Sequence, residues 1–502
     1  MRDGKNWAGE PQSDLSRLLA KPIVLVLALL AILVMGLFNA LPHVNEPIWQ
    51  DEAVTLSFHA SRGSVQPFLH YLSPNNHVAF TSLLAAWMSL FPEGLDVFTL
   101  RLLPLLLFLA AIPTLFFAAL RIGGPLCAIS AGAIFASSTV AGNFATQLRG
   151  YGPSWMFFSI MLLAAINIQF GRRRGFWQTV YLVSCLASVA LLPTNFFFAA
   201  ALSVSAAICV ALSAPNGIRS QVRTCALLLA APFLCLVVAY GAIWDELMTF
   251  SKIGFSDWSR TNLATHWLHG SLSNFIWIAP AAGAGLAVGI HQLARDRVKL
   301  ADINSYGFIF STLLILGFTA ALLAFPKAPF PRTLVPFLPV WIVAVTYLII
   351  HGIRIAGRGR LLPTFAASLL LFALPLPGEL SSTSCKDAKG QGGAHDYDLC
   401  YQYFRDKYQP GKVLDAWAAL NRSDIPIVTS FEGFYALDVL GSSAQVFEFT
   451  HFEPIGRPAP LLVAHDRSEF ELIARKTGVD PASYGPYADT GYFKVFAPGR
   501  AR

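Results

Sequence analysis

The chain has 502 residues, of which 55% are hydrophobic and only 13% are charged. Soluble globular domains carry about 25% charged residues, so this composition excludes an ordinary soluble protein and predicts a polytopic membrane protein. The formal net charge is +7. The Lys and Arg residues separate apolar runs and form no patch, which argues against nucleic-acid binding.

The chain begins with a polar segment, residues 1–21, which we predict to be cytoplasmic. The first apolar run, 22–42, lacks a small-residue cleavage site and is long enough to cross a bilayer. These two properties predict a signal anchor that stays attached to the protein.

Apolar runs of membrane-spanning length recur through residues 22–378, the predicted transmembrane domain. A spanning helix needs about 20 apolar residues, and the sequence contains about eleven such runs. The run Val78–Phe91 is too short to span and predicts an interfacial or re-entrant helix. The predicted spans are 22–42, 97–120, 125–147, 153–171, 176–193, 196–214, 224–243, 271–290, 304–325, 333–350 and 361–378.

The positive charges set the predicted orientation. Counting Val78–Phe91 as a further span would place the cluster Arg172–Arg174 outside the membrane. Because cytoplasmic loops carry an excess of Lys and Arg, the interfacial interpretation is favoured. The first loop, 43–96, and the tail, 379–502, are then both on the outer side.

The tail is long enough for a small domain. Cys385 and Cys400 lie in it and can form a disulfide if the compartment is oxidising. A helical stretch, Ser468–Thr477, lies among short β-rich runs, so we expect an α/β domain. The β-rich runs are Ile425–Thr429, Ala444–Phe449, Leu461–Ala464 and Tyr492–Phe496.

The predicted topology collects polar residues from distant loops at the outer face. A carboxylate there can act as a general base, and cations suit a phosphate group. The residues are Asp51 and Glu52 in the first loop, Asn76 and His77 before the interfacial helix, Arg149 and Tyr151 between the third and fourth spans, and Lys327 and Arg332 between the ninth and tenth.

Each of these residues also has a simpler interpretation. Asp51 and Glu52 could be solvated loop acids, and His77 could only hydrogen-bond the start of its helix. Arg149 could extend toward lipid headgroups, and Tyr151 could belong to an interfacial aromatic belt. The outer-loop pair His266 and His269 predicts no metal site, because it lacks a third ligand at suitable spacing.

Five short motifs in this order resemble the GT-C superfamily of glycosyltransferases that use polyprenyl-phosphate sugars. That superfamily includes the protein O-mannosyltransferases, the lipid A aminoarabinose transferase and bacterial relatives described as family 39-like. The motifs are Asp51-Glu52-Ala53, Asn76-His77, Arg101-Leu102-Leu103-Pro104, Gln147-Leu148-Arg149-Gly150-Tyr151 and Pro331-Arg332-Thr333-Leu334-Val335-Pro336.

The resemblance implies an inverting sugar transfer to an envelope lipid, glycan or protein acceptor. Asp51 would be the general base, with Glu52 beside it. The resemblance also implies a bacterial inner membrane with the active site facing the periplasm, and it leaves a divalent metal open. Arg149, Lys327 and Arg332 would bind the donor phosphate, and Asn76, His77 and Tyr151 would contact substrate.

The alternative function is a transporter or flippase of lipid-linked sugars. Such a protein predicts inverted repeats with broken helices and charges near the membrane midplane. The sequence shows no such repeat, and its polar residues fall at the outer rim.

Overall fold

The computed structural model describes two compact units. We call Met1–His43, Val78–Phe80 and Arg101–Leu399 the helical unit, and Val44–His77, Thr81–Leu100 and Cys400–Arg502 the mixed unit. The described residues are 19, 21–46, 48–71, 76–91, 95–171, 173–212, 218–250, 282–288, 290, 303–324, 331–356, 410–420, 424–438, 440, 444–449, 458–464, 467–490 and 493–499.

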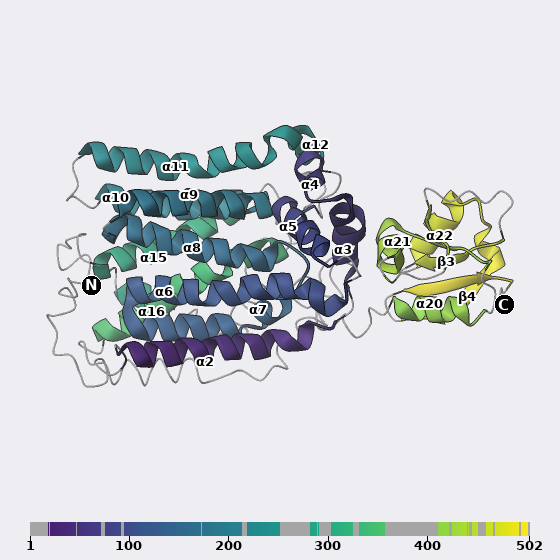
Figure 1. Cartoon of the computed structure of the whole chain (residues 1–502), viewed down its shortest axis with the longest axis horizontal. Helices are drawn as coiled ribbons and strands as arrows, with labels where there is room; N and C mark the ends of the chain where they lie inside the picture. Colours follow the sequence, from purple (N-terminus) through teal and green to yellow (C-terminus); the bar gives the residue numbers. More distant parts are fainter. Residues whose placement is uncertain are drawn as a thin grey trace. The chain divides into compact units, whose positions relative to one another are not determined.

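Long helices run side by side in the helical unit (Figure 1). Seven helical segments in the described part of the chain are long and apolar enough to cross a membrane. Together with shorter helices and α9, these segments make up the following α-helices: α2 (Pro22–Ala40), α6 (Val97–Ser137), α7 (Thr139–Phe144), α8 (Tyr151–Phe170), α9 (Arg174–Leu191), α10 (Asn195–Leu212), α11 (Ile218–Tyr240), α12 (Trp244–Phe250), α15 (Ile303–Ala324) and α16 (Leu338–Ala356).

Helices lie at most of the predicted span positions. Helix α9 lies at the predicted span 176–193 but is not among the seven strongly apolar segments. Of the predicted span 271–290, residues 282–288 are described and helical. The predicted span 361–378 lies outside the described residues. The structure therefore confirms a mostly helical membrane protein, and the number of spans stays a prediction.

Helix α6 is two helices joined by a sharp turn. Gly124 has φ of 78° and ψ of −171°, which is not helical, and Pro125 follows it. The rings of Phe108 and Phe135, on either side of the turn, lie 5.6 Å apart. The two halves therefore fold back on each other, as the predicted spans 97–120 and 125–147 require.

The predicted end of the second of these spans, at residue 147, is wrong. The helix stops at Ser137, because Ser138 has extended backbone. The side-chain amide of Asn39, in α2, donates to the carbonyl oxygens of Ala136 at 3.0 Å and Ser138 at 2.9 Å. These contacts satisfy carbonyl groups that the broken helix leaves open. The apolar run then continues in the short helix α7 and a loop.

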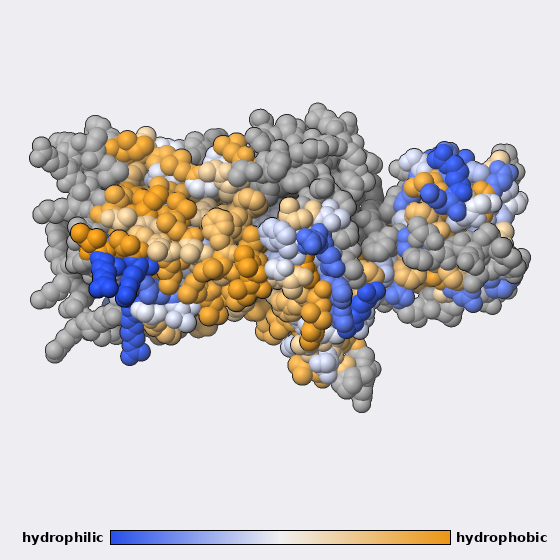
Figure 2. Space-filling model, turned by 90° about the horizontal axis from the view of Figure 1, so that it is seen from above, coloured by the Kyte–Doolittle hydropathy of each residue, from blue (hydrophilic) through white to orange (hydrophobic). Residues whose placement is uncertain are grey.

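Apolar side chains cover much of the face of the helical unit that Figure 2 shows. On α2, Ile23 is 62% exposed and Phe38 is 69% exposed. On α11, Val238 is 70% exposed. A surface this apolar matches lipid rather than water. The chain is a multi-pass membrane protein.

The first-loop part of the mixed unit is helical. Helix α3 (Gln50–Ala53) continues without a break into a π-helical turn (Val54–His59) and a 3-10 turn (Ala60–Arg62). Helix α4 (Gln66–Leu69) is short. Helix α5 (Val78–Ser89) has only 12 residues, so the prediction that this run is too short to span is confirmed. Its interfacial position stays a prediction.

The tail contributes a five-stranded sheet of order β2-β1-β3-β5-β4. Strands β1, β2 and β3 are parallel, and β5 is antiparallel to both β3 and β4. The predicted small α/β domain is confirmed, although β4 was missed. The elements are α20 (Gly411–Ala418), β1 (Ile427–Thr429), α21 (Phe431–Asp438), β2 (Val446–Glu448), β3 (Leu461–Ala464), α22 (Arg467–Lys476), β4 (Tyr484–Asp489) and β5 (Lys494–Pro498).

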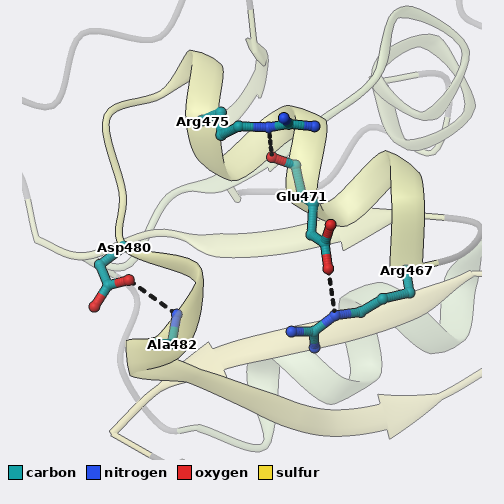
Figure 3. A network of polar contacts seen from close by, with 5 residues as sticks. All are labelled: Arg467, Glu471, Arg475, Asp480 and Ala482. Atoms are coloured by element: carbon teal, nitrogen blue, oxygen red, sulfur yellow. Dashed lines mark hydrogen bonds and ion pairs between the residues drawn. The ribbon is translucent and has the colours of Figure 1, made fainter.

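Two apolar cores lie on the two faces of this sheet, since alternate residues of a strand point to opposite faces. One core contains Ile427 and Val413, and the other contains Val428 and Phe470. Helix α22 presents an exposed ion pair, in which the Arg467 Nε lies 3.1 Å from the Glu471 Oε1 (Figure 3). Exposed pairs of this kind stabilise a fold little.

Candidate functional site

The acidic motif lies at the start of α3. Glu52 is the third helical residue, and its Oε2 accepts a hydrogen bond of 2.8 Å from the backbone N–H of Trp49, the residue before the helix. This contact is one half of a capping box. Glu52 is 1% exposed and Asp51 is 6% exposed. The interpretation of both residues as solvated loop acids is therefore wrong, and Glu52 has a clear structural role.

The backbone of Asp51 is held by a neighbouring side chain. The Thr55 hydroxyl donates to the Asp51 carbonyl oxygen at 2.9 Å. Asp51 sits in the first turn of a helical segment that continues to Arg62, where helix geometry stabilises a negative charge. The following turn is π-helical, a rare geometry found often at functional sites.

A buried histidine that the sequence analysis did not single out follows on the same segment. His59 is 4% exposed. Burial, and then the nearby charge of Arg62, lowers the pKa of His59 from 6.5 to about 4. His59 is therefore neutral at neutral pH. Its spacing of eight residues from Asp51, close to two helical turns, was a signal in the sequence that could have pointed to it.

Asn76 and His77 precede α5 and are both buried. The Asn76 amide nitrogen donates to the carbonyl oxygens of Pro67 at 3.2 Å and His70 at 2.9 Å. These bonds tie the end of α4 to the start of α5. The Asn76 Oδ1 is buried and has no hydrogen-bond partner among the described residues. The nitrogen thus holds the loop, and the oxygen is the atom that a substrate could use.

Arg149 lies in a tight turn before α8 in the helical unit. Its backbone N–H donates to the Gln147 carbonyl oxygen at 2.7 Å. Its guanidinium lies 5.2 Å from the centre of the Tyr151 ring. Arg149 and Tyr151 are each 3% exposed. Neither the lipid-headgroup interpretation of Arg149 nor the aromatic-belt interpretation of Tyr151 fits such burial.

A hydrogen-bonded chain of side chains holds this turn in place. The Ser154 hydroxyl donates to the Gly150 carbonyl oxygen at 2.6 Å. The Asn195 amide nitrogen, at the start of α10, donates to the Ser154 Oγ at 2.8 Å and to the Ser188 carbonyl oxygen at 2.8 Å. Three helices, α8, α9 and α10, are thereby joined one residue away from Arg149.

A second buried arginine supports the same loop from α6. Arg101 is fully buried, and its Nη1 donates to the Thr146 carbonyl oxygen at 3.2 Å. The Thr146 hydroxyl donates to the His43 carbonyl oxygen at 3.4 Å. Arg101 was part of a recognised motif but was not predicted as a site residue. Its direct role here is to fix the loop that carries Arg149.

The segment that carries Arg332 is attached to the same end of α8. It is a 3-10 helix, Pro331–Phe337, on which Arg332 is half-buried. The Trp155 indole N–H donates to the Val335 carbonyl oxygen at 2.7 Å. Trp155 is one helical turn beyond Tyr151, and Val335 is one 3-10 turn beyond Arg332. Sequence-distant segments bearing Arg149 and Arg332 are thus brought together. Lys327 lies outside the described residues.

The predicted site residues therefore fall into two groups. Arg149, Tyr151 and Arg332 belong to the helical unit, whereas Asp51, Glu52, Asn76 and His77 belong to the mixed unit. That the acid faces the cations stays a prediction. Within the described ranges, no group of three or more His, Cys, Asp and Glu residues is arranged to hold a metal ion. Cys385, Cys400, His266 and His269 lie outside those ranges.

No family model and no curated protein matches the chain. Among solved structures, ArnT (lipid A aminoarabinose transferase) from Cupriavidus metallidurans in the apo state is similar, with 13% identity, 94% of this chain and 97% of that chain covered, and a TM-score of 0.53. The same protein bound to undecaprenyl phosphate gives 12% identity, the same coverage and a TM-score of 0.54. The chain has the GT-C fold.

The GT-C fold was the expectation from the sequence motifs, and it is confirmed. The archaeal oligosaccharyltransferase AglB from Archaeoglobus fulgidus, in complex with an inhibitory peptide and a dolichol-phosphate, also matches. It has 10% identity, a TM-score of 0.48, and coverage of 95% of this chain and 74% of that chain. At such low identities, similarity to ArnT concerns the GT-C fold only, so the activity of this chain has to be argued from its own residues.

Proposed function

We propose that this protein is a glycosyltransferase that moves a sugar from a polyprenyl-phosphate donor to a lipid, glycan or protein acceptor. The observation that carries the proposal is Arg149, a guanidinium buried at one end of a bundle whose outer surface is apolar. Arginine binds phosphate through forked pairs of donors. A lipid-linked phosphate would place its chain along the apolar helices and its head group at such a cation.

In this proposal the acceptor hydroxyl attacks the anomeric carbon of the donor sugar. Asp51 accepts the hydroxyl proton as the new carbon–oxygen bond forms. The bond between the anomeric carbon and the phosphate oxygen breaks on the opposite side, so the configuration inverts. Polyprenyl phosphate leaves with the bonding electron pair, and Arg149, Arg332 and Lys327 stabilise its developing charge.

The remaining site residues have supporting roles in the proposal. Tyr151, whose ring lies beside the Arg149 guanidinium, would contact the donor. Asn76 and His77 would contact the substrate, with the Asn76 Oδ1 as an acceptor for a sugar hydroxyl. Glu52 would hold the helix that carries Asp51, as its bond to the Trp49 N–H supports. The expected location is a bacterial inner membrane, with the site facing the periplasm.

The test uses the purified full-length protein and a synthetic polyprenyl-phosphate sugar donor. Wild-type protein should release polyprenyl phosphate and form a glycosylated acceptor. Asp51→Asn should abolish transfer while the protein still folds and binds the donor. Asp245→Asn, at an exposed acid in α12, is the matched control and should remain active.

Two results would count against the proposal. Full activity of Asp51→Asn would remove Asp51 from the mechanism. Movement of intact lipid-linked sugar across reconstituted vesicles, with no release of polyprenyl phosphate, would support the flippase alternative instead.

A further inference from the structure

The tail domain and the acid-bearing segment belong to one compact unit, although more than 300 residues separate them in the sequence. Helix α21 of the tail packs against α3, which carries Asp51, and against the π-helical turn that follows. The reaction proposed above gives this packing no role, although the packing lies beside Asp51.

The first contact lies at the start of α3. The Trp49 side chain packs against the apolar core on one face of the tail sheet, a core that includes Trp417, Ile427 and Val463. The backbone N–H of Trp49 is also the group that Glu52 accepts from. Trp49 therefore joins the helix cap beside Asp51 to the interior of the tail domain.

The second contact lies two helical turns further on. The rings of Phe58 and Tyr435, which is on α21, lie 5.5 Å apart and are tilted by 58°. The Arg62 guanidinium lies 4.2 Å from the centre of the Phe58 ring. Tilted aromatic pairs and cation–π contacts of this kind hold their partners in a defined geometry. The segment from Trp49 to Arg62 is thus held by the tail at two points, on either side of Asp51.

We propose that the tail domain positions the general base, with Trp49 and Tyr435 as positioning residues that fix the helix carrying Asp51. The proposal rests on the function proposed above for Asp51. A general base must lie within hydrogen-bond reach of the proton that it accepts. A displacement of about 1 Å can lower the rate about a hundredfold. The contacts of Trp49 and Phe58 with the tail restrain the helix against such a displacement.

The first experiment measures the contact without using activity. Hydrogen–deuterium exchange of the peptide covering residues 48–62 is followed in the full-length protein. Tyr435→Ala should speed exchange in this peptide, and Tyr435→Phe, which keeps the ring, should not. The matched control is Tyr484→Ala, because Tyr484 belongs to the core on the opposite face of the sheet. Unchanged exchange in Tyr435→Ala would overturn the proposal, whatever reaction the protein performs.

The second experiment measures sugar transfer by the same variants. Tyr435→Ala should lower kcat by about ten- to a hundredfold while the KM for the donor stays unchanged, because the cations that bind the phosphate are in the helical unit. Tyr435→Phe should restore kcat, and Tyr484→Ala should keep it. An equal loss of kcat in Tyr484→Ala would overturn the positioning role and leave only a general need for a folded tail. A wild-type protein that transfers no sugar, with the exchange result intact, would refute the proposed function alone.

Discussion

The link from Asn195 to Gly150 predicts that a residue outside the phosphate site controls donor binding. Asn195 is fully buried and makes two hydrogen bonds, to the Ser154 Oγ and to the Ser188 carbonyl oxygen. Ser154 in turn donates to the Gly150 carbonyl oxygen, next to Arg149. Asn195→Ala removes the first two bonds and frees the Ser154 side chain to rotate.

The size of the effect follows from these bonds. Each buried hydrogen bond contributes about 0.5–1.5 kcal/mol net, so Asn195→Ala should cost about 1–3 kcal/mol of stability. If half of this loss falls on the turn that carries Arg149, donor affinity should fall about two- to twelvefold, since about 1.4 kcal/mol corresponds to a factor of ten. Ser154→Ala leaves the bond from Asn195 to Ser188 in place and should have a smaller effect.

The assay is thermal unfolding in detergent with increasing undecaprenyl phosphate, which reports both the basal Tm and the Kd of the lipid. The matched control is Gln178→Ala, which removes an interhelical hydrogen bond of 3.0 Å from Gln178 to Thr224. Gln178 is on α9, the helix that also contains Ser188, and lies about 15 Å along that helix from Ser188. The control should lower the Tm without changing the Kd. A Kd in Asn195→Ala equal to that of wild type, at a lowered Tm, would refute the reasoning.

Three further predictions concern single groups. Glu52→Ala should lower stability by about 1 kcal/mol through loss of the cap on Trp49, whereas Glu52→Gln should keep it, since Gln also serves in a capping box; thermal unfolding separates the two. The pKa of His59 is lowered to about 4 in the folded protein, so the unfolded chain protonates its imidazole more readily. The stability that neutral His59 contributes is therefore fully present above pH 6.5 and is lost as the pH falls through 4. His59→Gln should therefore flatten the pH dependence of the Tm in that window, and an unchanged slope would contradict the assignment. Arg149→Lys keeps the charge but loses the forked donors, so it should weaken undecaprenyl phosphate binding about tenfold or more in the same titration, whereas equal binding would argue against a forked contact.

Much of the fold could be predicted because the signal is local. An apolar run of bilayer length predicts a spanning helix whatever its neighbours are, as α2 and α10 show. Strands β1 and β3, which are buried at every position, were found in the same way from their short apolar runs. The end of the span predicted to reach residue 147 was wrong: the helix breaks at Ser138, and the carbonyl groups at the break are satisfied by Asn39 from another helix. Strand β4, with its proline, glycine and polar residues, carries no such apolar signal.

The sequence by itself determined the membrane class, the acidic motif at Asp51 and Glu52 and the arginines at 101, 149 and 332, because residue type and local spacing carry these features. Only the tertiary structure decided that Arg149 is buried, that Asn195 supports its turn and that Trp49 packs in the tail core. The burial of a charged side chain and the partners of a polar one depend on which distant segments meet. Hydropathy and local spacing do not specify those tertiary contacts.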